Sequence, residues 1–100
     1  MCKRWGSPTS ILGVFKDMGN VPDFDCNKVA KSGIYGLSSA SITNGPLGAF
    51  YGMLIEFRAI DQVRYQLAVD CRAGSSVDLW SRSYWQSGWS GWKKVTFGTT

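Results

Sequence analysis

The sequence predicts a small, mostly β fold: an antiparallel sheet with at most one short N-terminal helix. Three features of the 100-residue chain support this. The chain contains 12 Gly and 12 Ser but only 6 Leu, a composition that fits poorly with a helical bundle. Aromatic residues make up 14% of it, and 5 of them are Trp, which favours strands and binding surfaces. Its apolar runs have the length of strands, and loops rich in Gly, Ser, Asn and Pro separate them.

The chain divides into an N-terminal lead-in, residues 1–22, and a β domain, residues 23–100. An apolar content of 44% in so short a chain is typical of one globular domain with one core. In the lead-in, Ile11–Met18 fits a short amphipathic helical turn, and an extended segment fits the same residues. Pro22–Ser32 has the composition of turns, with one turn of helix over Lys28–Ala30.

Strands are predicted after residue 33. The five segments are Ile34–Leu37, Phe50–Arg58, Val63–Cys71, Val77–Tyr84 and Trp92–Phe97. The loops between them are predicted at Ser38–Gly48, Ala59–Gln62, Arg72–Ser76 and Trp85–Gly91. Because hairpins predominate and helices do not alternate with the strands, the sheet is expected to be antiparallel.

The third of these strands has the clearest alternation in the chain. One face carries Val63, Tyr65, Leu67, Val69 and Cys71. The other face carries Arg64, Gln66 and Asp70, with only the small Ala68 among them. This pattern is typical of a half-buried strand, whose apolar face is expected to lie against the core.

The chain has no His and three Cys, which excludes several kinds of chemistry. Without His there is no Ser-His-Asp or Cys-His catalysis and no His-ligated zinc. Cys2, Cys26 and Cys71 are too far apart for a redox or zinc motif, and an odd number cannot pair completely. We expect free thiols in a reducing cytoplasm, with Cys26 and Cys71 filling the core, and no cofactor or metal.

The net charge of +4 would attract anions, but the cations are scattered along the chain. Only Lys3-Arg4 and Lys93-Lys94 are adjacent, whereas nucleic-acid-binding domains concentrate their cations on one face. A nucleic-acid partner is therefore not expected. No apolar stretch approaches the roughly 18–20 residues that cross a bilayer. No signal peptide is evident either, so we expect no membrane insertion.

Six short motifs follow one another along residues 23–100. They are Lys31–Tyr35, Asn44–Pro46, Gly52–Ile55, Tyr65–Leu67, Leu79–Arg82 and Trp89–Val95. In this order and with these gaps, the chain resembles the pyocin knob family. That family has a Gly-x-Tyr strand, a Pro loop, an apolar strand opened by Gly, a Gln-containing strand, an aromatic-x-Arg strand and a closing Trp-x-x-Trp. The resemblance does not extend to Met1–Val21.

The resemblance implies a function. Knob modules lie near the host-contacting end of phage tail fibres, tailspikes and contractile pyocin fibres. It therefore implies an adhesin in the virion, at the tail fibre tip and made in the host cytoplasm, that binds a bacterial surface polysaccharide or lipopolysaccharide. It also implies a homotrimer in the native fibre. Surplus aromatic surface often ends at an interface, and Trp5, Phe15 or part of the Phe50–Phe57 strand are the candidates for it.

A binding site for such a glycan is predicted where four Trp lie within thirteen residues, from Trp80 to Trp92. Sugar rings stack their C–H faces on aromatic rings, and Arg or Gln side chains bind their hydroxyl or acidic groups. The candidate ligand-binding residues are Arg82, Tyr84, Trp85, Gln86 and Trp89. Trp80 and Trp92 lie on predicted strands and are expected in the core, whereas both a core and a contact role stay open for Trp85 and Trp89.

Arg82 has two alternative interpretations. It could anchor an anionic sugar or phosphate through its fork of donors. The structural alternative is favoured: the guanidinium stacks between the rings of Trp80 and Tyr84, or it pairs with Asp78 on the same face.

Asp23 and Asp25 provide the alternative of an enzyme. The run Asp-Phe-Asp-Cys-Asn lacks the Gly and Glu of an EF-hand loop, since Lys28 and Ile34 occupy those positions. The two carboxylates could act as a glycosidase pair, but Asp25 and Asn27 are more simply explained as turn caps. The leading prediction is thus a non-enzymatic adhesin. A glycan-cleaving tailspike fragment and a structural, trimerising knob without receptor contact are the alternatives.

Overall fold

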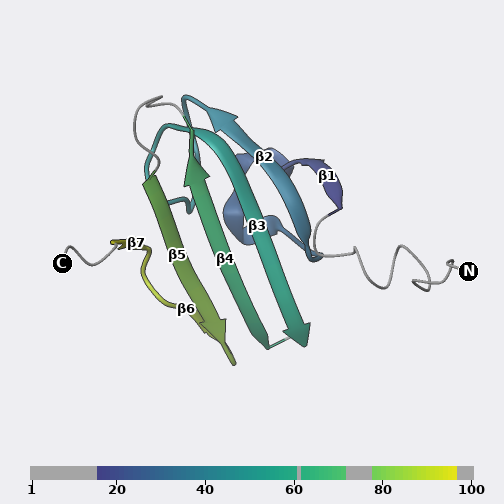
Figure 1. Ribbon diagram of the computed structural model, residues 1–100. Coiled ribbons are helices and arrows are strands. Elements are labelled where there is room, and N and C mark those ends of the chain that lie inside the picture. Colours follow the sequence, from purple (N-terminus) through teal and green to yellow (C-terminus); the bar gives the residue numbers. More distant parts are fainter. Residues whose placement is uncertain (1–15, 61, 72–77, 97–100) are drawn as a thin grey trace, which may run out of the picture.

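The computed structural model describes residues 16–60, 62–71 and 78–96, which form a seven-stranded sheet (Figure 1). The strands are β1 (Asp17–Asn20), β2 (Gly33–Ser39), β3 (Phe50–Ile60), β4 (Val63–Asp70), β5 (Asp78–Trp85), β6 (Gly88–Trp89) and β7 (Lys93–Val95). They lie side by side from β1 to β5 in sequence order, and both β6 and β7 pair with β5. The described helical residues are two three-residue 3-10 turns, η3 (Pro22–Phe24) and η4 (Cys26–Lys28). The prediction of a mostly β fold is confirmed.

The sheet is antiparallel in all of its described pairings but one. β1 runs parallel to β2, with Asp17 opposite Ile34 and Asn20 opposite Gly36. The prediction of an antiparallel sheet is wrong at this edge, because the sequence pattern does not reveal a strand at β1. Between β1 and β2 the chain crosses one face of the sheet through η3 and η4, and a crossover of this kind brings the next strand in parallel.

The other predicted strands lie close to the observed ones. β2, β3, β4 and β5 each begin and end within two residues of the prediction. The predicted loop Trp85–Gly91 contains the short β6, and β7 is shorter than the predicted Trp92–Phe97. Of the two alternatives for Ile11–Met18, the extended segment is the one observed at the end of this range, since Asp17 and Met18 belong to β1. Residues 11–15 and the loop predicted at Arg72–Ser76 lie outside the described residues.

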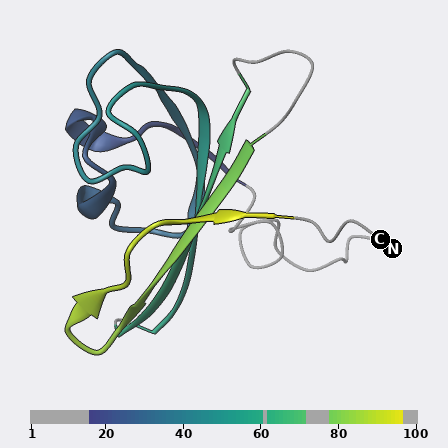
Figure 2. The same ribbon diagram turned by 90° about the vertical axis from the view of Figure 1, so that its left-hand side faces the viewer.

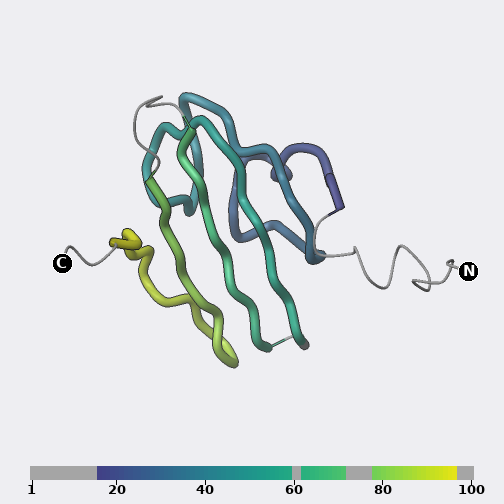
Figure 3. The backbone as a smooth tube through the Cα atoms, in the orientation of Figure 1, coloured from purple at the N-terminus to yellow at the C-terminus, as the bar shows by residue number. Residues whose placement is uncertain are grey.

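One face of the sheet, called the inner face below, is covered. Figures 2 and 3 show the η3–η4 segment and the loop between β2 and β3 on that side of the strands. The buried apolar residues come from both layers. The covering segments contribute Val21, Cys26, Val29 and Ile42, and the strands contribute Tyr35, Leu37, Phe50, Leu54 and Ala68. The opposite, outer face carries no covering segment among the described residues.

β4 alternates as predicted, but the opposite face is buried. Gln66 is fully buried and Asp70 is 6% exposed, whereas Tyr65 is 40% exposed. Leu67 and Val69 are half-buried on the outer face. The expectation that the apolar face of β4 lies against the core is therefore wrong. The cause is the covering segment, which presents polar groups to the inner face.

Cys26 is fully buried in the core, as predicted, while Cys71 is exposed and the prediction for it is wrong. Burial raises the pKa of the Cys26 thiol to about 11. At pH 8 this thiol is protonated as well as inaccessible, and the thiolate is the reactive form.

We expect a thiol reagent at pH 8 to modify Cys71 rapidly and Cys26 only as fast as the domain opens. Mass spectrometry of peptides from a labelling time course measures both rates. The Cys71→Ser variant is the control, since the rate at Cys26 should be the same in it as in the wild type. Equal rates at Cys26 and Cys71 in the native protein would contradict the buried position of Cys26.

Candidate functional site

A polar cluster centred on Glu56 lies in the middle of the inner face. The Glu56 carboxylate is fully buried. It accepts hydrogen bonds from Arg64 Nε at 2.6 Å and from Gln66 Nε2 at 2.7 Å. The guanidinium of Arg58 lies 3.3 Å from the same carboxylate. A buried charge is tolerated only when it is paired and hydrogen-bonded, and these three contacts meet that requirement.

The same cluster fastens the covering segment to the sheet. Arg58 and Arg64 both donate to the carbonyl oxygen of Val29, at 2.8 and 2.9 Å. Gln66 donates to the carbonyl oxygen of Cys26 at 2.8 Å. A segment of turns leaves some of its backbone carbonyl groups without hydrogen-bond partners of its own. The buried donors of β3 and β4 bind two of them.

Arg82 of β5 belongs to this cluster and is only 6% exposed. Its Nε donates to Gln66 Oε1 at 2.8 Å, and its Nη2 donates to Asn27 Oδ1 at 2.7 Å. The guanidinium carbon lies 3.8 Å from the ring centroid of Trp89 and 4.7 Å from that of Trp92. Burial lowers the pKa of Arg82 to about 10, so the side chain still carries its charge at neutral pH.

The stacked, structural interpretation of Arg82 thus describes its geometry, with a correction to its partners. The rings are Trp89 and Trp92, contributed by the chain after β5, instead of Trp80 and Tyr84. Asp78 forms an ion pair with Lys94 at 3.5 Å. As the donors of Arg82 point at Gln66 and Asn27, this side chain is poorly placed to bind a ligand.

Tyr84 and Trp89 also lie on the inner side of the sheet. Their rings meet edge to face, with centroids 5.2 Å apart. The guanidinium of Arg64 lies over both, 4.5 Å from the Trp89 centroid and 5.6 Å from that of Tyr84. Trp89 therefore contacts two arginines, an arrangement that stabilises the packing of β6 on β5.

Trp80 and Trp92 pack against the core, as predicted for both. The indole Nε1 of Trp92 donates to the carbonyl oxygen of Asn44 at 2.9 Å, which links the C-terminal end of the sheet to the β2–β3 loop.

Trp85 and Gln86 lie apart from these residues, at the tip of the β5–β6 hairpin. The Trp85 side chain is 64% exposed. Gln86 has a φ of +60°, which the tight turn requires, and its N–H donates to the Gln62 carbonyl at 3.0 Å. This bond joins the tips of two neighbouring hairpins. The five candidate residues thus form two groups: Arg82, Tyr84 and Trp89 inside, and Trp85 and Gln86 at the tip.

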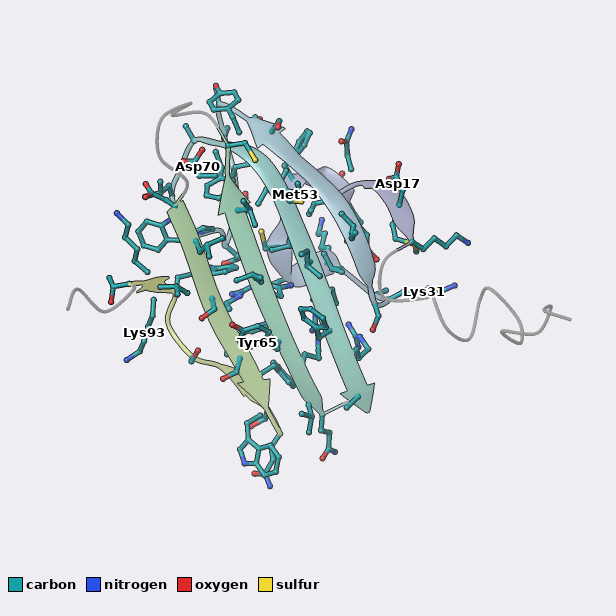
Figure 4. The ribbon with its side chains drawn as sticks, viewed as in Figure 1. Asp17, Lys31, Met53, Tyr65, Asp70 and Lys93 are labelled. Carbon is teal, nitrogen blue, oxygen red and sulfur yellow. The ribbon has the colours of Figure 1, made fainter. Side chains whose placement is uncertain are left out.

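Trp85 belongs instead to a group of aromatic side chains on the outer face, which we call the aromatic strip: Phe57, Tyr65 and Trp85. Phe57 of β3 is paired with Tyr65 of β4, and their ring centroids are 5.9 Å apart. Tyr65 is paired with Ser83 of β5, so Trp85 is its diagonal neighbour, within reach of a large side chain. Figure 4 shows Tyr65 on the open face of the sheet.

Sequence reasoning missed Phe57 and Tyr65 as surface residues. One signal was present: Glu56 interrupts an apolar run, and its neighbours Ile55 and Phe57 must point to the opposite face. A carboxylate at position 56 indicates that its face of the strand is polar. Phe57, the next residue, therefore lies on the other face.

The carboxylates considered for catalysis have structural roles. Asp25 Oδ1 accepts from Asn27 N at 3.0 Å and from Asn44 Nδ2 at 2.8 Å, so Asp25 is a turn cap as predicted. The hydrogen bond from Asn44 lowers the pKa of Asp25, whereas a glycosidase acid needs a raised pKa. Asp23 is exposed and pairs with Lys28 at 2.8 Å. Asn27 does not cap with its side chain, which accepts from Arg82.

Comparison of the chain with models of known families, with curated proteins and with solved structures found no match. Within residues 16–60, 62–71 and 78–96, no helix has the length and apolar character needed to span a membrane. The same residues hold no group of three or more His, Cys, Asp or Glu side chains that could bind a metal ion.

The Glu56→Gln substitution tests the buried cluster. It keeps the shape of the side chain but leaves the charges of Arg58 and Arg64 without a carboxylate. We expect the free energy of unfolding to fall by about 3–5 kcal/mol, because an uncompensated buried charge remains. Urea unfolding followed by Trp fluorescence measures it. The control is Asp78→Asn, which breaks a half-exposed ion pair and should cost less than about 1 kcal/mol. Similar losses for both variants would contradict the central role of Glu56.

Asp25 gives a prediction on pH. Its pKa is lowered in the folded state, so its stabilising effect is complete above the ordinary value of 3.8 and is lost as pH falls through the lowered value. We expect Asp25→Asn to cost about 1 kcal/mol at pH 7. This difference from the wild type should shrink as the pH falls below 3.8 in urea unfolding experiments. A difference that stays constant down to pH 2 would show that the charge of Asp25 has no role.

Proposed function

We propose that this chain is a non-enzymatic adhesin module of a phage tail fibre, tailspike or pyocin-like fibre. It recognises a bacterial surface glycan, a polysaccharide or lipopolysaccharide, through the aromatic strip. One observation carries the proposal: two of the most exposed large side chains, Trp85 at 64% and Tyr65 at 40%, lie on the same face of adjacent strands. Exposed rings on a regular scaffold are typical of contact surfaces.

The chemistry of the strip fits a sugar chain. Flat aromatic rings bind the C–H faces of sugar rings, and a row of rings across three strands offers contacts to successive sugar units. Hydrogen-bonding groups lie beside the rings: Gln62 and Gln86 at the two hairpin tips, and Ser83 opposite Tyr65, all of them exposed. These groups are uncharged, which suits the hydroxyl groups of a glycan.

The strip is also held in place before any ligand binds. Phe57 of β3 is in register with Tyr65 of β4, and Tyr65 with Ser83 of β5, while the irregularity in the β3–β4 pairing lies beyond them, between Arg58 and Ile60. The Gln86–Gln62 backbone hydrogen bond fixes the two tips relative to one another. Rings that are already ordered lose little conformational entropy on binding, which favours affinity.

The fibre context rests on the resemblance of the six motifs to the pyocin knob family. Against the glycan-cleaving alternative stand the lowered pKa of Asp25 and the exposed ion pair of Asp23. The structural knob without receptor contact is tested by the same experiment as the adhesin.

The test is an array of bacterial lipopolysaccharides and capsular polysaccharides probed with the labelled domain. We expect binding to a subset of them, weakened about tenfold or more by Trp85→Ala or Tyr65→Ala, because each removes a ring that stacks on the sugar. Trp85 is 64% exposed, so Trp85→Ala should keep the wild-type unfolding midpoint, whereas Tyr65→Ala also removes the ring contact with Phe57 and should lower the midpoint slightly without unfolding the domain. The control is Leu47→Ala, which removes a comparably exposed apolar side chain from the β2–β3 loop on the opposite side and should bind normally.

Each other outcome has a defined meaning. A blank array at millimolar ligand would overturn the adhesin and leave the structural knob. Binding that is unchanged in both aromatic variants would keep the adhesin but remove the strip as its site. Release of reducing ends from a polysaccharide would favour the tailspike enzyme.

A further inference from the structure

The outer face holds a second apolar group beside the aromatic strip, which we call the aliphatic patch. Its members form two adjacent rows across five strands: Met53, Val69, Leu79 and Val95 in one row, and Ile34, Ile55 and Leu67 in the next. Met53 is 37% exposed, and the other members are half-buried. No segment in the described part of the chain lies over these rows.

A sheet with one apolar face open is half of a two-layer arrangement. Apolar sheet faces are normally packed against a second layer, which for another sheet lies about 10 Å away. Strand spacings of about 4.8 Å and rises of about 3.4 Å per residue give β2–β5 an outer face of roughly 500 Å². Two such faces would bury about 1,000 Å², the lower limit for a specific interface. A second copy of the chain therefore has enough area to cover the patch.

Charged residues at the two edges of this face favour a second copy of the chain as the binding partner and determine its orientation. Within the two rows, β2 to β5 carry no charged side chain. Beyond β2, Asp17 is in register with Ile34, and beyond β5, Lys93 is in register with Ser81. Both are exposed, and Figure 4 shows them at opposite edges of the face that bears Met53 and Tyr65. The row thus ends in a negative charge on one side and a positive charge on the other.

We propose that the aliphatic patch is an interface between copies of this chain, related by a rotation axis parallel to the strands. Rotation about such an axis brings the Asp17 edge of one copy beside the Lys93 edge of the next. A two-fold axis in the sheet plane but perpendicular to the strands would instead place Asp17 near Asp17 and Lys93 near Lys93. The opposite charges favour the first arrangement, and complementary charges fix register more than they add affinity.

This interface and the proposed glycan site share the outer face, because an interface that uses the whole face of β2–β5 also covers Phe57 and Tyr65. The patch occupies the middle of the outer face, while Trp85 lies at the hairpin tip at one end of it. Two copies are the smallest assembly about this axis, and a larger closed ring about the same axis pairs the same edges. An interface of this size lies at the weak, transient end of the range, so we expect association of the domain alone only at high protein concentration.

Sedimentation equilibrium of the domain at concentrations up to about 500 µM tests the proposal. We expect reversible association that Met53→Lys weakens tenfold or more, because it places a charge in the centre of the buried patch. The control is Ala30→Lys, which adds the same charge on the exposed surface of the covering segment and should associate like the wild type. A protein that stays monomeric throughout, or an association that Met53→Lys leaves unchanged, would overturn the interface.

Charge exchange tests the orientation. Asp17→Lys and Lys93→Asp should each weaken association, and the double variant should restore it, since the two edges then attract again. Asp17 also accepts a hydrogen bond from Gly19 N at 2.9 Å, so far-UV circular dichroism of each variant must match the wild type. If Asp17→Lys alters the spectrum, the Asp17→Asn variant replaces it, and association is then measured at low and at high salt. High salt should weaken the association of the wild type more than that of the variant. A double variant that associates no better than either single one would overturn the parallel axis.

Discussion

The buried carboxylate of Glu56 is the constraint on which the rest of this structure depends. One negative charge on β3 binds Arg64 and Gln66 of β4 and lies beside Arg58 of its own strand. Gln66 also accepts a hydrogen bond from Arg82, which extends the network to β5. In a medium of low dielectric each of these groups would be costly alone, and together they satisfy one another. Their remaining donors bind Cys26, Asn27 and Val29, so the covering segment is held by hydrogen bonds as much as by apolar packing.

This network also determines what the other face of the sheet looks like. Side chains of a strand alternate between two faces, so a strand whose polar side chains point inward must point its apolar ones outward. β4 shows the consequence: Gln66 is fully buried, and its neighbour Tyr65 is 40% exposed. The exposure of the aromatic strip and that of the aliphatic patch therefore have the same cause. They are exposed because the covering segment binds the polar side of β3, β4 and β5.

The sequence predicts where the strands lie, but it does not predict which face of each strand is buried. Strand positions, the core roles of Trp80 and Trp92 and the cap at Asp25 follow from local pattern, because each depends on residues close in sequence. Which face of β4 is buried depends on a segment some forty residues away, as the Gln66–Cys26 bond shows. Alternation identifies two faces but not the covered one. For the same reason Trp85 and Trp89 looked alike in the sequence, although strand parity and the hairpin turn place them on opposite sides of the sheet.

The aromatic residues lie on two different faces of the sheet, and this limits the kinds of sugar that the proposed adhesin can bind. Arg64 and Arg82 would be the natural ligands of an acidic sugar, but Arg64 binds Glu56 and Arg82 binds Gln66 and Asn27. Both guanidinium groups lie against the ring of Trp89 on the inner side. The polar residues next to Tyr65 and Trp85 are Ser83, opposite Tyr65, and Gln62 and Gln86 at the hairpin tips, and all three side chains are uncharged. The donors of both guanidinium groups are already bound inside the domain, whereas exposed rings and amides bind sugar faces and hydroxyl groups without a charge to desolvate. Within the proposed function, the strip is therefore better suited to neutral sugar units than to acidic ones.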